Sequence, residues 1–80
     1  MTRLGVVAIV LEDRERVPEM NQVLSLFGEI IVGRMGIPHR ERDVFTIALI
    51  VEGSTDEIGA MTGRLGQIPC LKVKSALTAV

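Results

Sequence analysis

The stretch RMGIPHRERD, residues 34–43, carries the side chains of this chain that are best suited to binding an anion. It holds the single histidine and three of the nine Lys+Arg residues. Guanidinium groups and a protonated imidazole donate charge-assisted hydrogen bonds to carboxylates and phosphates. One interpretation is a solvated hairpin turn shaped by Gly36 and Pro38. The other is a ligand or interface loop that a second subunit completes, with Arg34 pointing across the interface; its members are Arg34, Gly36, Pro38, His39 and Arg40.

A metal centre is disfavoured by the number of available ligands. A protein metal site needs three or four ligands, and this chain offers one histidine, His39, and one distant cysteine, Cys70. Cys70 follows a proline and has no second cysteine or neighbouring base, so we interpret it as a small, half-buried side chain and not as a nucleophile. We therefore expect no metal, no cofactor and no catalytic residue.

The stretch GAMTGRLG, residues 59–66, looks at first like a phosphate-binding loop. It lacks the Gly-Lys-Ser/Thr ending of that motif, and its glycines fall inside a predicted helix. A glycine in a helix interior costs about 0.5–1 kcal/mol relative to alanine. We expect Gly59 and Gly63 to offset this cost by allowing the close approach of a neighbouring helix, a partner chain or a ligand, and we expect Gly66 to cap the helix.

Composition limits the classes of partner. The chain has 80 residues, 48% of them hydrophobic, with no Trp, no Tyr and two Phe, so a single domain spanning 1–80 would have an aliphatic core. A net charge of −1 and the scarcity of aromatic residues disfavour direct binding of nucleic acid. The longest apolar run, VVAIVL, is far shorter than the roughly 20 residues of a membrane-spanning helix. With no signal-peptide pattern and one cysteine, the sequence predicts a cytoplasmic protein that does not bind membranes.

Hydrophobic periodicity predicts six elements in the order βαββαβ. A period of two marks strands within 3–13, 29–36, 43–53 and 70–77, and a helical period marks 15–28 and 54–69. The second helix opens with a capping box formed by Ser54 and Glu57. The first and third strands are apolar on both faces, whereas the fourth carries Lys72 and Lys74, which is typical of a strand at the edge of a sheet.

These strand patterns select one topology. Right-handed crossovers and a short link between the second and third strands give a ferredoxin-like α+β fold, in which an antiparallel four-stranded sheet carries both helices on one face. The first and third strands are then central. Their second apolar face lies in water unless another subunit covers it, so we expect a homodimer or homotetramer assembled through the sheet face.

Three stretches, IVLEDRE, NQVLSLFGEIIVGRMGIPHRE and DEIGAMTGRLGQIPCLKVK, resemble the small ACT-like bacterial proteins known as iron-only hydrogenase system regulators. The resemblance covers nearly the whole chain. It implies an ACT-like, ferredoxin-like homo-oligomer with a regulatory role, acting on transcription through a protein partner or a small anionic or amino-acid effector. The chain has no helix-turn-helix of its own. An enzyme built on a ferredoxin-like dimer ranks last among the functions, because only His39, Cys70 and the loop arginines could supply polar groups to its pocket.

The alternative is an accessory regulatory subunit of a metabolic enzyme, of the amino-acid-binding ACT type. In such domains an Asp-Arg-Pro-Gly turn after the first strand contacts the effector. Here Asp13-Arg14 is followed by three other residues before Pro18, and the glycine is absent. An enzyme purified together with this chain would favour the alternative over the first function.

Replacing Ile9 or Leu49 with Asp is predicted to abolish assembly or folding. Each residue belongs to a strand that is apolar on both faces, and an uncompensated buried charge costs several kcal/mol. Circular dichroism and light scattering of the two variants test this expectation, which a folded variant with the wild-type subunit number would contradict.

Overall fold

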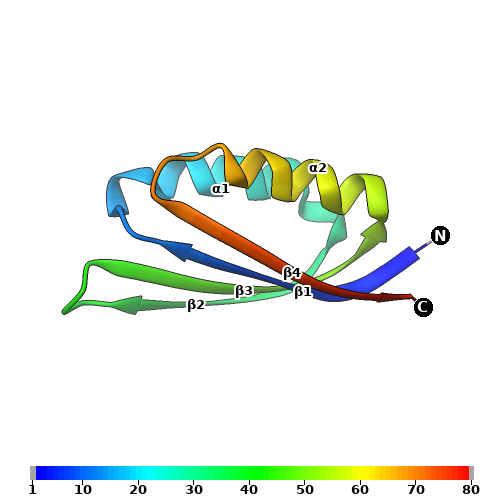
Figure 1. The fold of residues 1–80 in the computed structure, drawn as a ribbon, viewed down its shortest axis with the longest axis horizontal. Coiled ribbons are helices and arrows are strands. Elements are labelled where there is room, and N and C mark those ends of the chain that lie inside the picture. The colour runs from blue at the N-terminus through cyan, green and yellow to red at the C-terminus, as the bar shows by residue number, and fades with distance from the viewer. Residues whose placement is uncertain (1, 80) are drawn as a thin grey trace.

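Two helices lie on one face of a four-stranded antiparallel sheet in the computed structural model of the chain, which describes residues 2–79 (Figure 1). The sheet order is β2-β3-β1-β4, so the first and third strands are central, as the sequence predicts. Two short 3-10 turns flank the first helix, η1 before it and η2 after it. The elements are β1 (Thr2–Leu11), η1 (Arg14–Arg16), α1 (Val17–Leu26), η2 (Gly28–Ile30), β2 (Ile31–His39), β3 (Val44–Ser54), α2 (Thr55–Gly66) and β4 (Leu71–Ala79).

The core lies between the sheet and the helices, and it is aliphatic. In the β1–β3 register Val7 pairs with Leu49 and Ile9 with Ile47, and the helices exclude solvent completely from all four side chains. The helices contribute the other side of this layer: Met20, Val23 and Leu24 from α1, and Ile58, Met61 and Leu65 from α2. Since Ile9 and Leu49 belong to this layer, the Asp substitutions at these positions test folding and not assembly.

The second helix starts at the capping box that the sequence predicts. The backbone N–H of Ser54 donates to Glu57 Oε1 at 2.9 Å, and the N–H of Glu57 donates to Ser54 Oγ at 3.0 Å. The hydrogen bond from the Ser54 backbone, followed by the one involving its side chain, lowers the pKa of Glu57 below its ordinary value of 4.5. The charged form of Glu57 therefore supports the first turn of α2.

The β2–β3 hairpin differs from the predicted turn. Gly36 and Pro38 do not shape it, because β2 continues through both residues to His39 and the turn lies at 40–43. Pro38 pairs with Phe45 in an edge strand, where a missing N–H is tolerated because that side of the strand has no neighbour. The chain reverses instead at Asp43, whose φ of 54° is left-handed, and the N–H of Arg42 donates to the His39 carbonyl at 3.1 Å.

The end of α2 also differs from the prediction. Gly66 is the last helical residue and not a left-handed cap; the N–H of Gln67 closes the helix by donating to the Arg64 carbonyl at 3.2 Å. The left-handed residue is Cys70, with φ at 66°, and its side chain is exposed and not half-buried as predicted. Its carbonyl accepts from the N–H of Glu12 at 2.8 Å, which ties the start of β4 to the end of β1.

Replacing Glu57 with Gln is expected to change how stability depends on pH. A carboxylate whose pKa is lower in the folded state contributes stability above its unfolded pKa, and this contribution is lost as the pH falls through the folded value. Wild type is therefore expected to be more stable than Glu57→Gln at neutral pH, with a difference that shrinks in acid. Urea unfolding at neutral and strongly acidic pH measures it. Glu41→Gln, in the exposed hairpin turn, is the matched control, and a pH-independent difference for Glu57→Gln would contradict the expectation.

Candidate functional site

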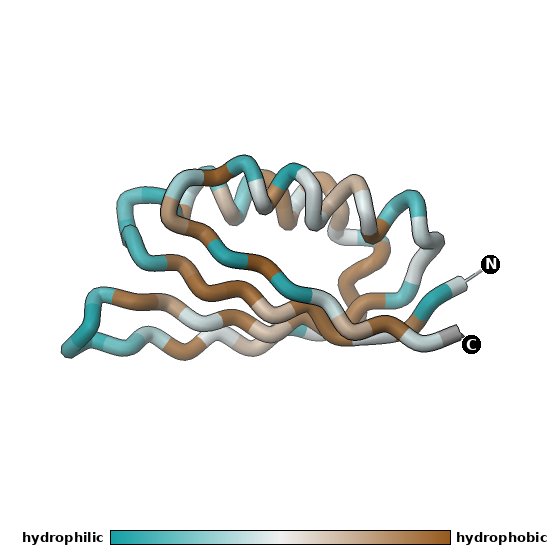
Figure 2. Tube along the Cα trace, in the orientation of Figure 1, coloured by the Kyte–Doolittle hydropathy of each residue, from teal (hydrophilic) through white to brown (hydrophobic). Residues whose placement is uncertain are grey.

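The face of the sheet opposite the helices is apolar and uncovered. Cross-strand pairing of Val6 with Ile50 and of Met35 with Ala48 puts these side chains on that side. Val6, Ile50 and Met35 are 41%, 42% and 63% exposed. Figure 2 shows apolar segments along the strands and a hydrophilic hairpin tip. We call this surface the open face; its residues are Leu4, Val6, Ala8, Val10, Met35, Ile37, Ala48, Ile50 and Ala76.

A bulge in β2 enlarges the open face. Ile31 pairs with Val51 but Gly33 pairs with Ile50, so one extra residue enters the edge strand between them. A shift of one residue sends every following side chain to the opposite face of the sheet. Met35 and Ile37 therefore lie on the open face, and Arg34 lies on the helix side.

A hollow of about 460 Å³ lies where the open face reaches the hairpin. Its polar groups face one another in two pairs: His39 Nε2 lies 3.0 Å from Thr46 Oγ1, and Lys72 Nζ lies 3.1 Å from Glu12 Oε1. Arg42 stands at the hairpin turn beside them. We call this site the hairpin hollow; it is lined by Val10, Glu12, His39, Arg42, Val44, Thr46 and Lys72.

The five residues of the predicted loop do not gather at one site. Arg34 does not point out from the sheet face; it pairs with Leu49 on the helix side, and its Nη2 donates to Asn21 Oδ1 of α1 at 3.4 Å. Gly36 and Pro38 face the same side. Arg40 and His39 line a smaller hollow at the turn, with Glu41 and Arg42.

Of the five predicted residues, only His39 lines the hairpin hollow. The sequence analysis missed Arg42, Thr46, Lys72 and Glu12 as site residues. Lys72 and Glu12 lie sixty positions apart in the sequence, and the β1–β4 register is what brings them together. The signal that points to Thr46 is its place as the only polar residue in the apolar run 44–51.

The glycines divide into two kinds. A Cβ on Gly36 would lie 2.8 Å from Cε1 of Phe45, so this glycine leaves room for the aromatic ring of its diagonal neighbour. A Cβ on Gly59 or Gly63 would meet no described atom within 4 Å. The expectation that these glycines allow close approach of the neighbouring helix is therefore wrong. The other two expectations, contact with a partner chain or with a ligand, stay predictions. A Cβ on Gly66 would reach only ordinary van der Waals contact with Val73.

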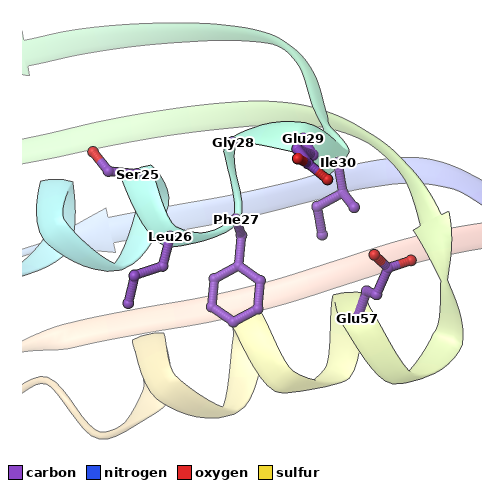
Figure 3. A pocket seen from close by; sticks show the side chains of 7 residues that line it. All are labelled: Ser25, Leu26, Phe27, Gly28, Glu29, Ile30 and Glu57. Carbon is purple, nitrogen blue, oxygen red and sulfur yellow. The ribbon is translucent and has the colours of Figure 1, made fainter.

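A second hollow, of about 370 Å³, lies between η2 and the first turn of α2 (Figure 3). It is lined by Glu57 and by residues 25–30, which include the Phe27 ring and Ile30. Its carboxylate at Glu57 is already engaged in the capping box. The other polar side chains of this hollow are Ser25 and Glu29, and it has no cationic side chain, so the hairpin hollow is the better candidate for binding an anion.

Within residues 2–79, no three His, Cys, Asp or Glu side chains come close enough together to hold a metal ion. The helices of this part of the chain are also too short or too polar to span a membrane.

Comparison with known proteins gives a family match over most of the chain. Residues 3–75 match the TM1266-like model, described as "Iron-only hydrogenase system regulator, putative". The chain is 38% identical to the uncharacterized protein TM1266 from Thermotoga maritima, with a TM-score of 0.92, covering 99% of this chain and 100% of that one. No curated protein matches the sequence.

More distant structures share the fold. A candidate glycine cleavage system transcriptional repressor superposes with a TM-score of 0.71 at 20% identity, over 100% of this chain and 48% of that one. CPII from Thiomonas intermedia K12, a nitrogen regulatory PII-like protein bound to ADP, AMP and bicarbonate, gives 0.57 at 11% identity, over 100% and 98% of the two chains. At these identities the likeness extends to the ACT-like and PII-like ferredoxin fold alone.

Replacing Gly59 and Gly36 with Ala is expected to change stability in opposite directions. Gly59→Ala adds a methyl group in open space on a helix and should stabilise the fold by about 0.5–1 kcal/mol. Gly36→Ala forces the Phe45 ring to move and should destabilise the fold by about 1–3 kcal/mol. Urea unfolding measures both. Sedimentation of Gly59→Ala adds a second readout, because a loss of subunits would mean that Gly59 contacts another copy.

Proposed function

Because the chain belongs to the TM1266-like family, we propose that it is a small regulatory homo-oligomer that assembles through the open face and acts through a protein partner or a small effector. The family description supports a regulatory role and not an enzymatic one. The observation that carries the assembly is the uncovered open face, because one layer of helices covers only one side of the sheet (Figure 1).

The open face has the composition of an interface. The β1 row runs from Leu4 through Val6 and Ala8 to Val10 with no polar side chain, and Ala48 and Ile50 of β3 lie beside it. Charged residues stand around this centre, at Glu52 on β3 and at Lys72 and Lys74 on β4. An apolar centre with a charged rim is typical of protein interfaces.

A second copy of this chain is the occupant that fits the open face. An isologous dimer buries the same patch on both subunits, so an apolar centre meets an apolar centre. Pairing along the sheet edges is disfavoured, since β2 contains Pro38 and a bulge and β4 carries two lysines. In an 80-residue domain, burial of the open face would add to a thin stability margin.

An effect on transcription would pass through a partner or effector. The two helices are separated by two strands, so the described part of the chain forms no helix-turn-helix. The net charge of −1 also gives little attraction to phosphate backbones.

The turn after β1 gives little support to the amino-acid-binding alternative. Asp13 Oδ1 accepts from the N–H of Glu15 at 3.0 Å, and Arg16 Nη1 lies 2.7 Å from Glu19 Oε1. Asp13 caps η1, and Arg16 forms an ion pair with Glu19 in the first turn of α1, so these polar groups are already engaged within the chain. An effector is better accommodated elsewhere on this molecule.

Replacing Val6 with Asp is expected to convert the assembly to folded monomers. Val6 is 41% exposed in one chain, so the carboxylate remains hydrated in a monomer, whereas burial between two chains would cost several kcal/mol. Sedimentation at micromolar concentration measures subunit number against the 8.7 kDa chain, and circular dichroism checks the fold.

Leu26→Asp is the matched control, since Leu26 is 61% exposed on the helix layer and should not affect assembly. A monomeric wild type would contradict the proposed assembly, and so would a Val6→Asp protein with the wild-type subunit number.

A further inference from the structure

We propose, as a deepening of the regulatory function above, that the hairpin hollow binds a small carboxylate carrying a short apolar chain. The hollow combines an unpaired guanidinium, a histidine–threonine pair and two valines within one surface depression. Nothing in the family description assigns a ligand to it. The charges, the hydroxyl and the apolar floor each restrict the kind of molecule that fits.

Arg42 supplies the free positive charge. Two other basic residues near this end are engaged: Arg14 Nε lies 3.2 Å from Asp43 Oδ1, and Lys72 Nζ lies 3.1 Å from Glu12 Oε1. Arg40 makes no ion pair within residues 2–79, but it lines the smaller hollow at the turn and not the hairpin hollow. The Arg42 guanidinium makes no ion pair and no side-chain hydrogen bond to any residue within 2–79. Because Lys72 neutralises Glu12, the lining carries a net positive charge, and a planar guanidinium matches a carboxylate with two parallel hydrogen bonds.

The His39–Thr46 pair adds a hydroxyl donor. When the histidine ring donates through Nε2 to Thr46 Oγ1, 3.0 Å away, the threonine O–H is free to donate to an anion. Thr46 comes from the start of β3 and His39 from the end of β2, so both stand on paired strands and not on the turn.

Two valines favour an anion with a carbon chain. Val10 and Val44 lie on the two central strands, β1 and β3, and contribute apolar surface beside the polar groups. An alkyl chain that covers them releases their hydration water, which an inorganic anion cannot do. The volume of about 460 Å³ lies within the range of about 300–1,000 Å³ that small-ligand sites occupy. Val10 also belongs to the open face, so the hollow borders the surface proposed for assembly.

The test is an NMR titration of the full chain with sodium butyrate at constant ionic strength. Saturable shifts are expected at the backbone amides of Val10, Val44 and Thr46. Inorganic phosphate, which lacks the carbon chain, and butylammonium, which reverses the charge, are expected to bind at least about tenfold more weakly. Comparable binding of either one would overturn the proposal.

Arg42→Gln is expected to weaken butyrate binding about tenfold or more, because hydrogen bonds to charged groups contribute roughly 1.5–3 kcal/mol and a factor of ten corresponds to about 1.4 kcal/mol. Arg64→Gln, the same change on α2, should leave binding at the wild-type level. Equal affinities of the two variants would overturn the site.

Sedimentation of the same samples separates this site from the proposed assembly. If the wild type binds butyrate but sediments as a monomer, the result supports the site and contradicts the assembly. An assembled wild type with no butyrate-induced shifts overturns the site and leaves the assembly standing.

Discussion

The rest of this structure depends on one constraint: a single layer of two short helices must cover a four-stranded sheet. Among the strand side chains of residues 2–79, complete shielding from water is confined to one row of β1 and β3, which includes Val7, Ile9 and Leu49. Because side chains alternate along a strand, burying this row forces the row of Val6 and Ile50 to the other side. A single chain therefore removes only one of these two apolar rows from water and leaves the other exposed.

Element length explains where the candidate site lies. A strand of eleven residues such as β3 extends roughly 36 Å, whereas a helix of twelve residues such as α2 extends roughly 18 Å. The strands are therefore longer than the helix layer, and the β2–β3 hairpin extends beyond it (Figure 1). The hollow lies on the open face at this projecting end, where no described helix covers the sheet, so polar groups such as Arg42 and His39 stay accessible while β1 and β3 hold the floor of the hollow in place.

The open face and the hairpin hollow are continuous, which connects the two proposals physically. Val10 belongs to both surfaces, and Thr46 continues the β3 row of Ala48 and Ile50. A ligand that covers Val10 would lie against the edge of an assembled partner. Ligand binding and assembly would then change each other's free energy reciprocally, as linked equilibria require. Such coupling is a way for a chain without a DNA-binding motif to act as a regulator.

The sequence by itself determined the element order, the central place of the two strands that are apolar on both faces, the edge strand with Lys72 and Lys74, and the capping box at Ser54. These features depend on local periodicity and on contacts within one turn, which a sequence displays directly. Only the tertiary structure decided which side chains of β2 share a face. The bulge after Ile31 reverses the alternation, so Arg34 turns to α1 and Met35 turns to the open face. It also decided the membership of the hollow, because the strand register brings Glu12 beside Lys72 across a separation that no local pattern records.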